Sequence, residues 1–202
     1  MPRKVIFLID KSNDWILPII KKHKFNFKKK YIFNISTNYK TVKNNDIVFI
    51  INYTKILSKK FLNNNKKNLV IHSSKLPKDK GFAPMQNQIL RGKNKIFFSL
   101  IEAIESVDSG KIYLSSSLKL KGHELNDELR NLQAREIINL IEKFLKRFPN
   151  IVGKKQSGLS TFNKKRNPKD SEININKSIK SQFNLIRIAD NNRYPLFFKI
   201  KK

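Results

Sequence analysis

Cysteine is absent from this chain, and so is any long apolar run. Without cysteine there is no disulfide framework and no thiolate metal site, and the 3 histidines lie too far apart in the sequence for a zinc cluster. We therefore expect no bound metal. No stretch approaches the roughly 18 to 20 apolar residues of a membrane-spanning helix. The first apolar run, residues 5–9, stops at Asp10 and is too short for a signal peptide, so we expect a cytoplasmic protein with no membrane span.

Acidic residues are scarce: the chain has 15 Asp and Glu against 43 Lys and Arg, a net charge of +28. Such a charge favours phosphate-bearing partners, nucleic acid among them. Lysine and asparagine are, however, abundant along the whole chain, as in residues 28–30 and 63–67, and no aromatic and basic residues interleave as they do in known nucleic-acid-binding modules. We interpret the charge as a compositional bias and do not favour a nucleic-acid partner, although the sequence leaves that alternative open.

Glycine-rich fingerprints are missing too. The 6 glycines form neither the loop of a dinucleotide-binding fold nor that of a P-loop nucleotide triphosphatase. The sequence therefore argues against nicotinamide and P-loop chemistry.

Short apolar runs separated by helical segments dominate the chain. Runs of this kind predict buried strands joined by right-handed crossovers. The predicted strands are residues 5–9, 31–35, 46–51, 69–72, 95–101 and 111–120. The predicted helices are residues 14–20, 54–61, 84–90, 124–148 and 179–189, and the polar segment 153–174 is expected to be a loop. The pattern predicts an α/β fold with a doubly wound, mostly parallel sheet.

His72 ends the fourth predicted strand and begins a loop with the sequence HSSKLP. In sheets of this type ligands bind beyond the carboxyl ends of the strands, which is where His72 falls. Asp108 begins the triplet Asp-Ser-Gly, whose residue types also form ordinary turns. A single loop histidine most often bonds only to backbone. The position of His72 at a strand end, before Leu76 and Pro77, favours a catalytic role instead.

Several segments resemble those of the folate-dependent formyltransferases. They are YTKILS at 53–58, HSSKLP at 72–77, DSG at 108–110 and, in the tail, Thr161-Phe162, Asp170 with Ile173, Leu185-Ile186-Arg187 and Tyr194-Pro195. Members of this family transfer a formyl unit from 10-formyltetrahydrofolate to an amine. The resemblance implies a Rossmann-like catalytic domain at 1–149 with a C-terminal extension at 150–202 packed on it. It also implies an enzyme that uses 10-formyltetrahydrofolate as co-substrate and no metal.

The resemblance implies that His72 and Asp108 are the catalytic residues. Formyl transfer passes through a tetrahedral oxyanion, and the attacking nitrogen must lose a proton. A donor aimed at an oxyanion contributes roughly 3 to 4 kcal/mol, and a positioned acid or base roughly a hundred- to ten-thousand-fold in rate. Asp108 would hold His72 in its working tautomer and favour the protonated ring that stabilises the oxyanion. The same carboxylate can help to move the proton from the amine to the folate nitrogen.

Two positions depart from the family pattern. Val70 stands where the family usually has an asparagine, and Lys111 stands where an acidic residue is common. The catalytic triad of the family is therefore incomplete. Three residues could supply the missing oxyanion donor, and the sequence does not choose among Asn68, Ser74 and Asn87.

The resemblance also implies binding residues on both sides of the catalytic pair. The residues expected to contact the folate are Tyr53, Lys55, Leu57, Ile104 and Val107. The residues expected to contact the acceptor are Ser74, Lys80, Phe82 and Pro84.

The expected acceptor is a small-molecule amine, the amino group of a nucleotide-linked amino sugar used in glycan biosynthesis. Methionyl-tRNA formyltransferases carry a further barrel domain of roughly a hundred residues, and we expect none after Lys202. Two alternatives stay open: a catalytically impaired folate-binding homologue, and a methionyl-tRNA formyltransferase-like RNA-binding protein. A homodimer is compatible with the sequence.

Overall fold

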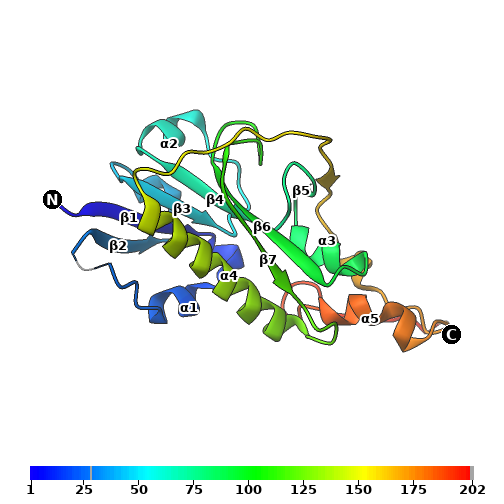
Figure 1. Ribbon diagram of the computed structural model, residues 1–202. Helices are drawn as coiled ribbons and strands as arrows, with labels where there is room; N and C mark the ends of the chain where they lie inside the picture. Colours follow the sequence, from blue (N-terminus) through cyan, green and yellow to red (C-terminus); the bar gives the residue numbers. More distant parts are fainter. Residues whose placement is uncertain (28, 201–202) are drawn as a thin grey trace.

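A computed structural model describes residues 1–27 and 29–200. Six strands form one sheet in the order β2-β1-β3-β4-β6-β7 (Figure 1). These strands are β1 (Arg3–Ile9), β2 (Tyr31–Ser36), β3 (Ile47–Ile51), β4 (Asn68–His72), β6 (Lys95–Glu102) and β7 (Ile112–Lys119). The helices are α1 (Leu17–Lys22), α2 (Lys59–Asn63), α3 (Pro84–Leu90), α4 (Asn126–Arg147) and α5 (Ile179–Arg187). The α/β fold class predicted from the sequence is confirmed.

The central strands are apolar throughout because both faces of the sheet are covered. Alternate side chains of β1 enter two separate clusters: Phe7 packs in the larger one and Leu8 in the smaller. The larger cluster lies under α1, α3 and α4, with Phe144 of α4 fully buried. The smaller cluster receives Phe61 of α2 on the other face. Figure 1 shows α4 running across the sheet and α2 on the opposite side.

The sheet is mixed but mostly parallel, as the sequence predicted. Strands β2, β1, β3 and β4 pair in parallel, as predicted. Strand β6 pairs antiparallel with β4, and β7 pairs antiparallel with β6. The carboxyl ends of β1, β3 and β4 therefore share one edge, while β6 ends at the opposite edge.

Three local predictions need correction. The helix expected at 54–61 is a loop followed by α2, which begins at Lys59 after the Ser58 side chain caps it. The helix expected at 14–20 begins later, at Leu17, with Pro18 in its first turn. The loop expected at 153–174 contains a two-residue strand, β8 (Phe162–Asn163), which pairs in parallel with β5 (Lys80–Gly81). The 3-10 turns are η1 (Lys11–Asn13), η2 (Tyr39–Thr41) and η3 (Pro168–Ser171).

A buried charge cluster joins the C-terminal segment to the rest of the chain. The Arg187 side chain at the end of α5 is fully buried, and its Nη2 lies 3.2 Å from Oε2 of Glu124. Its Nη1 also donates to the Asn94 side chain over 3.1 Å. Breaking a buried pair of this kind leaves one charge without a partner at a cost of several kcal/mol. Arg187 therefore holds α5 against the start of α4.

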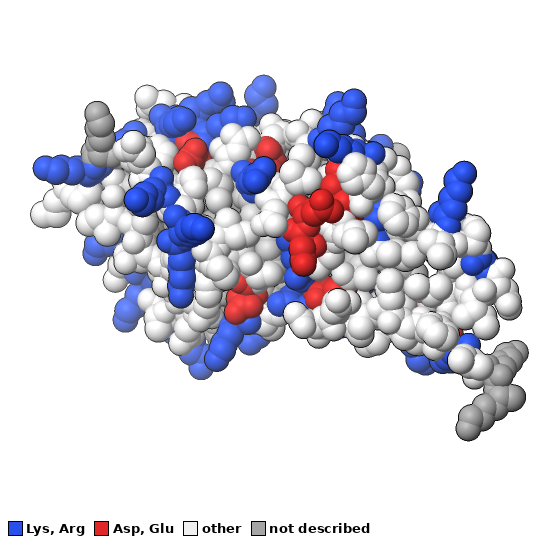
Figure 2. Space-filling view, turned by 90° about the horizontal axis from the view of Figure 1, so that it is seen from below, with Lys and Arg blue, Asp and Glu red and all other residues white. Residues whose placement is uncertain are grey.

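On the face of the molecule that Figure 2 shows, basic side chains are spread out and do not form one patch. Figure 2 shows Lys and Arg side chains at many points along the margins of that face, with Asp and Glu side chains gathered toward its middle. This distribution agrees with a compositional excess of lysine. Among the described residues, no helix is long and apolar enough to cross a membrane.

Candidate active site

His72 lies at the carboxyl end of β4 and faces Asp108 from the loop between β6 and β7. Its Nδ1 is 3.6 Å from Oδ1 of Asp108, and both side chains are nearly buried, with 7% and 11% of their surface exposed. The ring Nε2 lies 2.8 Å from the backbone oxygen of Asp79. Because a carbonyl oxygen only accepts, Nε2 carries a proton, and a second proton on Nδ1 would point at the Asp108 carboxylate. The structure thus brings the two predicted catalytic residues together.

Asp108 occupies a loop conformation that several neighbours fix. Its backbone has a positive φ of 52°, which Asp tolerates better than most residues. Its Oδ2 accepts a hydrogen bond from the backbone N–H of Gly81 over 2.8 Å. The Gln156 side chain donates to the backbone oxygens of Asp108 and Gly110 over 2.8 and 2.9 Å. Gln156 lies in the segment that the sequence assigned to a plain loop, and no motif pointed to it.

None of the three proposed oxyanion donors directs its polar group at His72. Asn68 begins β4, roughly 13 Å away at about 3.3 Å per residue, and its amide donates to the Leu62 backbone oxygen over 2.8 Å. The Ser74 hydroxyl donates to the Lys78 backbone oxygen over 2.7 Å. The Asn87 side chain donates to the backbone oxygens of Phe82 and Ala83, just before α3, over 3.0 Å each. The amide and hydroxyl donors of these residues are engaged with backbone, so a donor for the oxyanion must come from His72 itself or from a rearrangement.

Val70 is part of the smaller apolar cluster. Its side chain packs with that cluster, where Val48, Ile50 and Phe61 are buried. The face of β4 that ends at His72 is therefore apolar at the position two residues earlier. Lys111, the other departure from the family pattern, is exposed at the start of β7.

The two loops expected to contact folate lie next to each other. Tyr53, Leu57 and Ala103 pack against the same smaller cluster, and Nζ of Lys59, at the start of α2, lies 3.7 Å from Oε1 of Glu105. The large apolar side chains of this region are unusually exposed for their type. They are Ile56, Ile104 and Val107, with Lys55 beside them also exposed.

The residues expected to contact the acceptor divide into buried and exposed groups. Ser74 and Lys80 are buried, and Nζ of Lys80 donates to the Ser109 hydroxyl over 2.8 Å. Phe82 is 42% exposed, and Pro84 is the first residue of α3. Phe82 is therefore the member of this group most available to a ligand, whereas Lys80 connects the loop after His72 with the Asp108 loop.

Asp10 was not singled out in the sequence, and it holds the loop at 53–58 in place through Thr54. It follows β1 at the shared carboxyl edge, and its Oδ2 accepts hydrogen bonds from the Thr54 backbone N–H, over 2.9 Å, and from the Thr54 hydroxyl. Its Oδ1 accepts two more from Ser12. Burial alone would raise the pKa of Asp10, but these hydrogen bonds outweigh it and lower the pKa to about 2. The sequence signal that could have indicated this role of Asp10 is an acidic residue directly after a central strand.

We predict that Asp10→Asn lowers the free energy of unfolding at pH 7 by about 2 kcal/mol, because one pKa unit corresponds to about 1.4 kcal/mol. A lowered pKa stabilises the fold above the ordinary value of 3.8 and stops doing so as the pH falls to about 2. The difference between the two proteins should therefore shrink between pH 4 and pH 2. Urea unfolding at pH 7, 4 and 2 measures it. A difference that does not change with pH would contradict this role.

Gly81 lies where β5 and β8 meet and also supports Asp108. Its φ is +84°, and a Cβ there would lie 2.6 Å from the Asn163 backbone oxygen. We predict that Gly81→Ala costs about 3 kcal/mol of stability, because backbone strain and the clash add. Gly92→Ala is the matched control, since Gly92 has a φ of +75° and nothing within 4 Å. It should cost about 1 kcal/mol. Equal losses in urea unfolding would show that the close approach of the two strands is unimportant.

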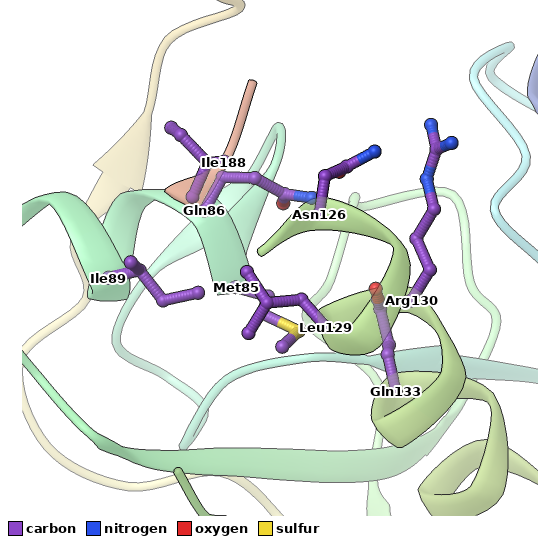
Figure 3. Close-up of a pocket in the computed structure, with 8 residues that line it drawn as sticks. All are labelled: Met85, Gln86, Ile89, Asn126, Leu129, Arg130, Gln133 and Ile188. Atoms are coloured by element: carbon purple, nitrogen blue, oxygen red, sulfur yellow. The ribbon is translucent and has the colours of Figure 1, made fainter. Parts of the chain in front are cut away.

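A crevice lies between α3, α4 and the end of α5 (Figure 3), and His72 is not among the residues that line it. Met85 and Leu129 lie next to each other in it, and both are buried. Gln133, at the same place, donates to the Ser73 hydroxyl over 3.0 Å. Arg130 pairs with Asp190 over 2.6 Å. Of these contacts, the one from Gln133 holds the side chain of Ser73, directly after His72. Among the described residues, no group of three or more His, Asp or Glu side chains could hold a metal ion.

The fold and the His72–Asp108 arrangement agree with a known family. The sequence model of the family described as formyl transferase matches residues 3–142. This match covers well over half of the chain, and the protein belongs to the formyl transferase family.

The proteins similar to this chain include methionyl-tRNA formyltransferases and a sugar formyl transferase that shares the fold. Methionyl-tRNA formyltransferase of Sulfurihydrogenibium sp. is 30% identical over 170 residues, which are 80% of this chain and 54% of that protein. The chain thus spans about half the length of the curated relatives it matches. A solved methionyl-tRNA formyltransferase from Clostridium thermocellum superposes with a TM-score of 0.82 at 28% identity, covering 98% of this chain and 88% of the other. WlaRD, a sugar 3N-formyl transferase solved with dTDP and 5-N-formyl-THF, shares the fold, with a TM-score of 0.67 at 18% identity over 98% and 83% of the two chains.

Proposed function

We propose that this protein transfers a formyl group from 10-formyltetrahydrofolate to a primary amine, with His72 and Asp108 as its catalytic residues. The observation that carries the proposal is the approach of His72 Nδ1 to within 3.6 Å of the Asp108 carboxylate, at the edge of the sheet where ligands of such folds bind. Family membership supplies the type of reaction, and the geometry supports the assignment of the two residues.

The amine nitrogen attacks the formyl carbon, and a new C–N bond forms as the carbonyl electrons move to the oxygen. When the tetrahedral intermediate collapses, the bond to the folate nitrogen breaks, and the proton lost by the amine ends on that nitrogen. His72 stabilises the oxyanion through a ring N–H, and Asp108 stabilises the positive charge on the ring and relays the proton. Because Nε2 bonds to the Asp79 backbone oxygen, the ring must exchange that oxygen for the substrate oxygen when the substrate binds.

The two adjacent loops suit the folate. A pteridine ring presents two apolar faces and a polar edge, so it needs exposed apolar side chains beside free backbone groups. Ile104 and Val107 are 45% and 43% exposed, and Tyr53 and Leu57 lie in the facing loop. Folate bound here would cover that apolar surface and lie against the His72–Asp108 pair. Asp10 acts as a positioning residue for the loop through Thr54.

For the acceptor we retain the amino group of a nucleotide-linked sugar as the first candidate. Its support is the solved sugar formyl transferase that shares the fold and was crystallised with a nucleotide. Methionyl-tRNA is the second candidate, supported by the curated relatives at 30% identity. An impaired folate-binding homologue is the third, because the proposed oxyanion donors bond to backbone.

The test combines folate binding with turnover. A thermal shift with 5-formyltetrahydrofolate reports binding, and mass spectrometry after incubation with 10-formyltetrahydrofolate reports formylation of dTDP- and UDP-linked amino sugars or of methionyl-tRNA. Formylation of one acceptor class identifies the branch. Folate binding without turnover on any amine would indicate the impaired homologue. The absence of folate binding would contradict the proposal as a whole.

A further inference from the structure

The ring N–H that His72 offers is already bonded to the protein itself. Its Nε2 donates to the backbone oxygen of Asp79 over 2.8 Å. A formyl oxygen that accepts from the same nitrogen must first displace this oxygen, because one N–H points in one direction. The backbone oxygen of Asp79 is therefore a competitor of the formyl oxygen that is built into the chain.

The C-terminal segment holds the peptide group that carries this oxygen. The N–H of the same peptide group, that of Lys80, donates to the Thr161 backbone oxygen over 2.8 Å. The N–H of Asp79 donates to the Thr161 hydroxyl, also over 2.8 Å. Thr161 directly precedes β8, which pairs with β5. A peptide group that donates at one end and accepts at the other is polarised, so each bond strengthens the other.

The Asp79 side chain is held separately, by Arg91 at the C-terminal end of α3. Nη2 of Arg91 lies 2.6 Å from Oδ1 of Asp79, and Nη1 donates to the Asn163 side chain over 3.3 Å. We call these three residues the Arg91 clasp. The clasp joins the end of α3, the loop after His72 and β8, which are far apart in the sequence.

These anchors leave the Asp79 oxygen little freedom to turn away from His72. The N–H of Asp79, its carboxylate and the N–H that follows it all have partners. The ring must therefore give up a hydrogen bond to an oxygen that is held in place. When only a fraction of the molecules has the ring free, the apparent affinity for a ligand that needs the ring falls by that fraction.

The ion pair is the anchor most easily altered. The Arg91 side chain is 43% exposed and that of Asp79 is 15% exposed, whereas the other anchors bond to the backbone of the loop. A partly exposed pair contributes little to the stability of the whole chain. A substitution at Arg91 should therefore loosen the Asp79 oxygen without unfolding the protein.

We propose that Arg91 is a positioning residue that acts through Asp79: the clasp determines how firmly the Asp79 oxygen competes with the formyl oxygen for His72. The formyl group in this statement rests on the proposed function, whereas the effect of the clasp on the His72 ring does not. Opening the clasp should strengthen the binding of a formyl donor, because less of the protein is held in the state in which the ring is occupied.

The first experiment compares two ligands that differ only in the formyl group. Calorimetry without an acceptor and without oxygen gives the affinities for 10-formyltetrahydrofolate and for tetrahydrofolate. The ratio of the two affinities isolates the formyl group, since the loss of a positive charge acts on both ligands. We expect Arg91→Gln to raise this ratio by at least roughly twofold, because a hydrogen bond of this kind contributes about two- to tenfold.

Lys93→Gln is the matched control, because it removes the same charge from an exposed residue two positions along the chain. It should leave the ratio unchanged. Equal ratios in Arg91→Gln and Lys93→Gln, with folate bound by both, would overturn the proposal.

Asp79→Asn opens the clasp from its other side. Asparagine tolerates the positive φ of this position, which is 60°. The double variant with Arg91→Gln should raise the affinity ratio no further than either single variant, because both substitutions break one contact. Effects that add would show that the two residues act independently, and they would contradict a clasp.

The second experiment needs no ligand. NMR on the free protein measures how fast the Nε2 proton of His72 exchanges with water, and a hydrogen bond slows this exchange. Arg91→Gln should speed it up, and Lys93→Gln should not. An unchanged exchange rate in Arg91→Gln would overturn the proposal, whether or not the protein binds folate. Faster exchange in a protein that binds no folate would support the clasp and contradict the proposed function.

Discussion

His72→Ala should transfer formyl groups at least roughly a hundredfold more slowly than the unchanged protein, because a positioned acid or base contributes on the order of a hundred- to ten-thousand-fold. The substitution removes the ring N–H that is proposed to stabilise the oxyanion. It also leaves the Asp79 backbone oxygen without the N–H that it accepts over 2.8 Å. The measurement is the turnover number with 10-formyltetrahydrofolate and the acceptor identified in the formylation screen.

The control for this variant is His123→Ala, which removes an exposed imidazole at a turn before α4 and should leave turnover unchanged. His72→Gln places an amide N–H near the position of the ring Nε2, which bonds to the Asp79 backbone oxygen, and so guards against a folding defect. The melting temperatures of all three proteins should stay close to that of the unchanged chain. If His72→Ala, folded and able to bind folate, turns over at more than a third of the normal rate, then His72 is not catalytic.

Asp108→Asn should lower the turnover number by roughly two orders of magnitude while the affinity for folate changes little. The amide oxygen can still accept from the Gly81 N–H, which bonds to Asp108 over 2.8 Å, and asparagine tolerates the positive φ of this position. The loop therefore keeps its shape. The charge that stabilises a protonated His72 is lost, as is the group proposed to relay the proton. Steady-state kinetics with varied folate separates turnover from affinity.

A matched control for Asp108→Asn is Asp127→Asn, the same change in the exposed first turn of α4. It should alter turnover less than twofold. A loss of folate affinity with normal turnover in Asp108→Asn would assign Asp108 to binding instead of to the chemical step.

The fully buried central strands could be predicted from the sequence. Residues 5–9 and 47–51 are apolar without interruption because clusters cover both faces of the sheet there. Placing His72 at the carboxyl end of a central strand followed from the same pattern. Its approach to Asp108 depended on the resemblance to a family, since nothing local ties two residues that are 36 positions apart.

Other features left no signal in the sequence. Strand direction is one, because the apolar run in β6 reads the same in a parallel or an antiparallel pairing. The pairing of β5 with β8 involves only two residues on each side, too few for a periodic pattern. The loop at 53–58 contains residues with helical spacing, but hydrogen bonds from Thr54 to Asp10 hold it outside a helix.

Asn68 shows that a residue on the same face of a strand as a catalytic residue does not have to lie near it. Alternation placed it correctly on the same side of β4 as Val70 and His72. Its distance along the strand and its bond to the Leu62 backbone oxygen exclude it from the catalytic pair as it stands. The two-residue period of a strand fixes the face of the sheet on which a side chain lies. The groups that this side chain can contact depend on the surrounding loops.

A crystal structure with 5-formyltetrahydrofolate bound is the most direct test of the central claim, because it does not depend on the acceptor. The pteridine ring should lie between the loop at 53–58 and the loop at 103–109, with the formyl oxygen within hydrogen-bonding distance of a ring nitrogen of His72 and that nitrogen released from the Asp79 backbone oxygen. Folate bound away from these loops, or a formyl group that contacts neither His72 nor Asp108, would contradict the account.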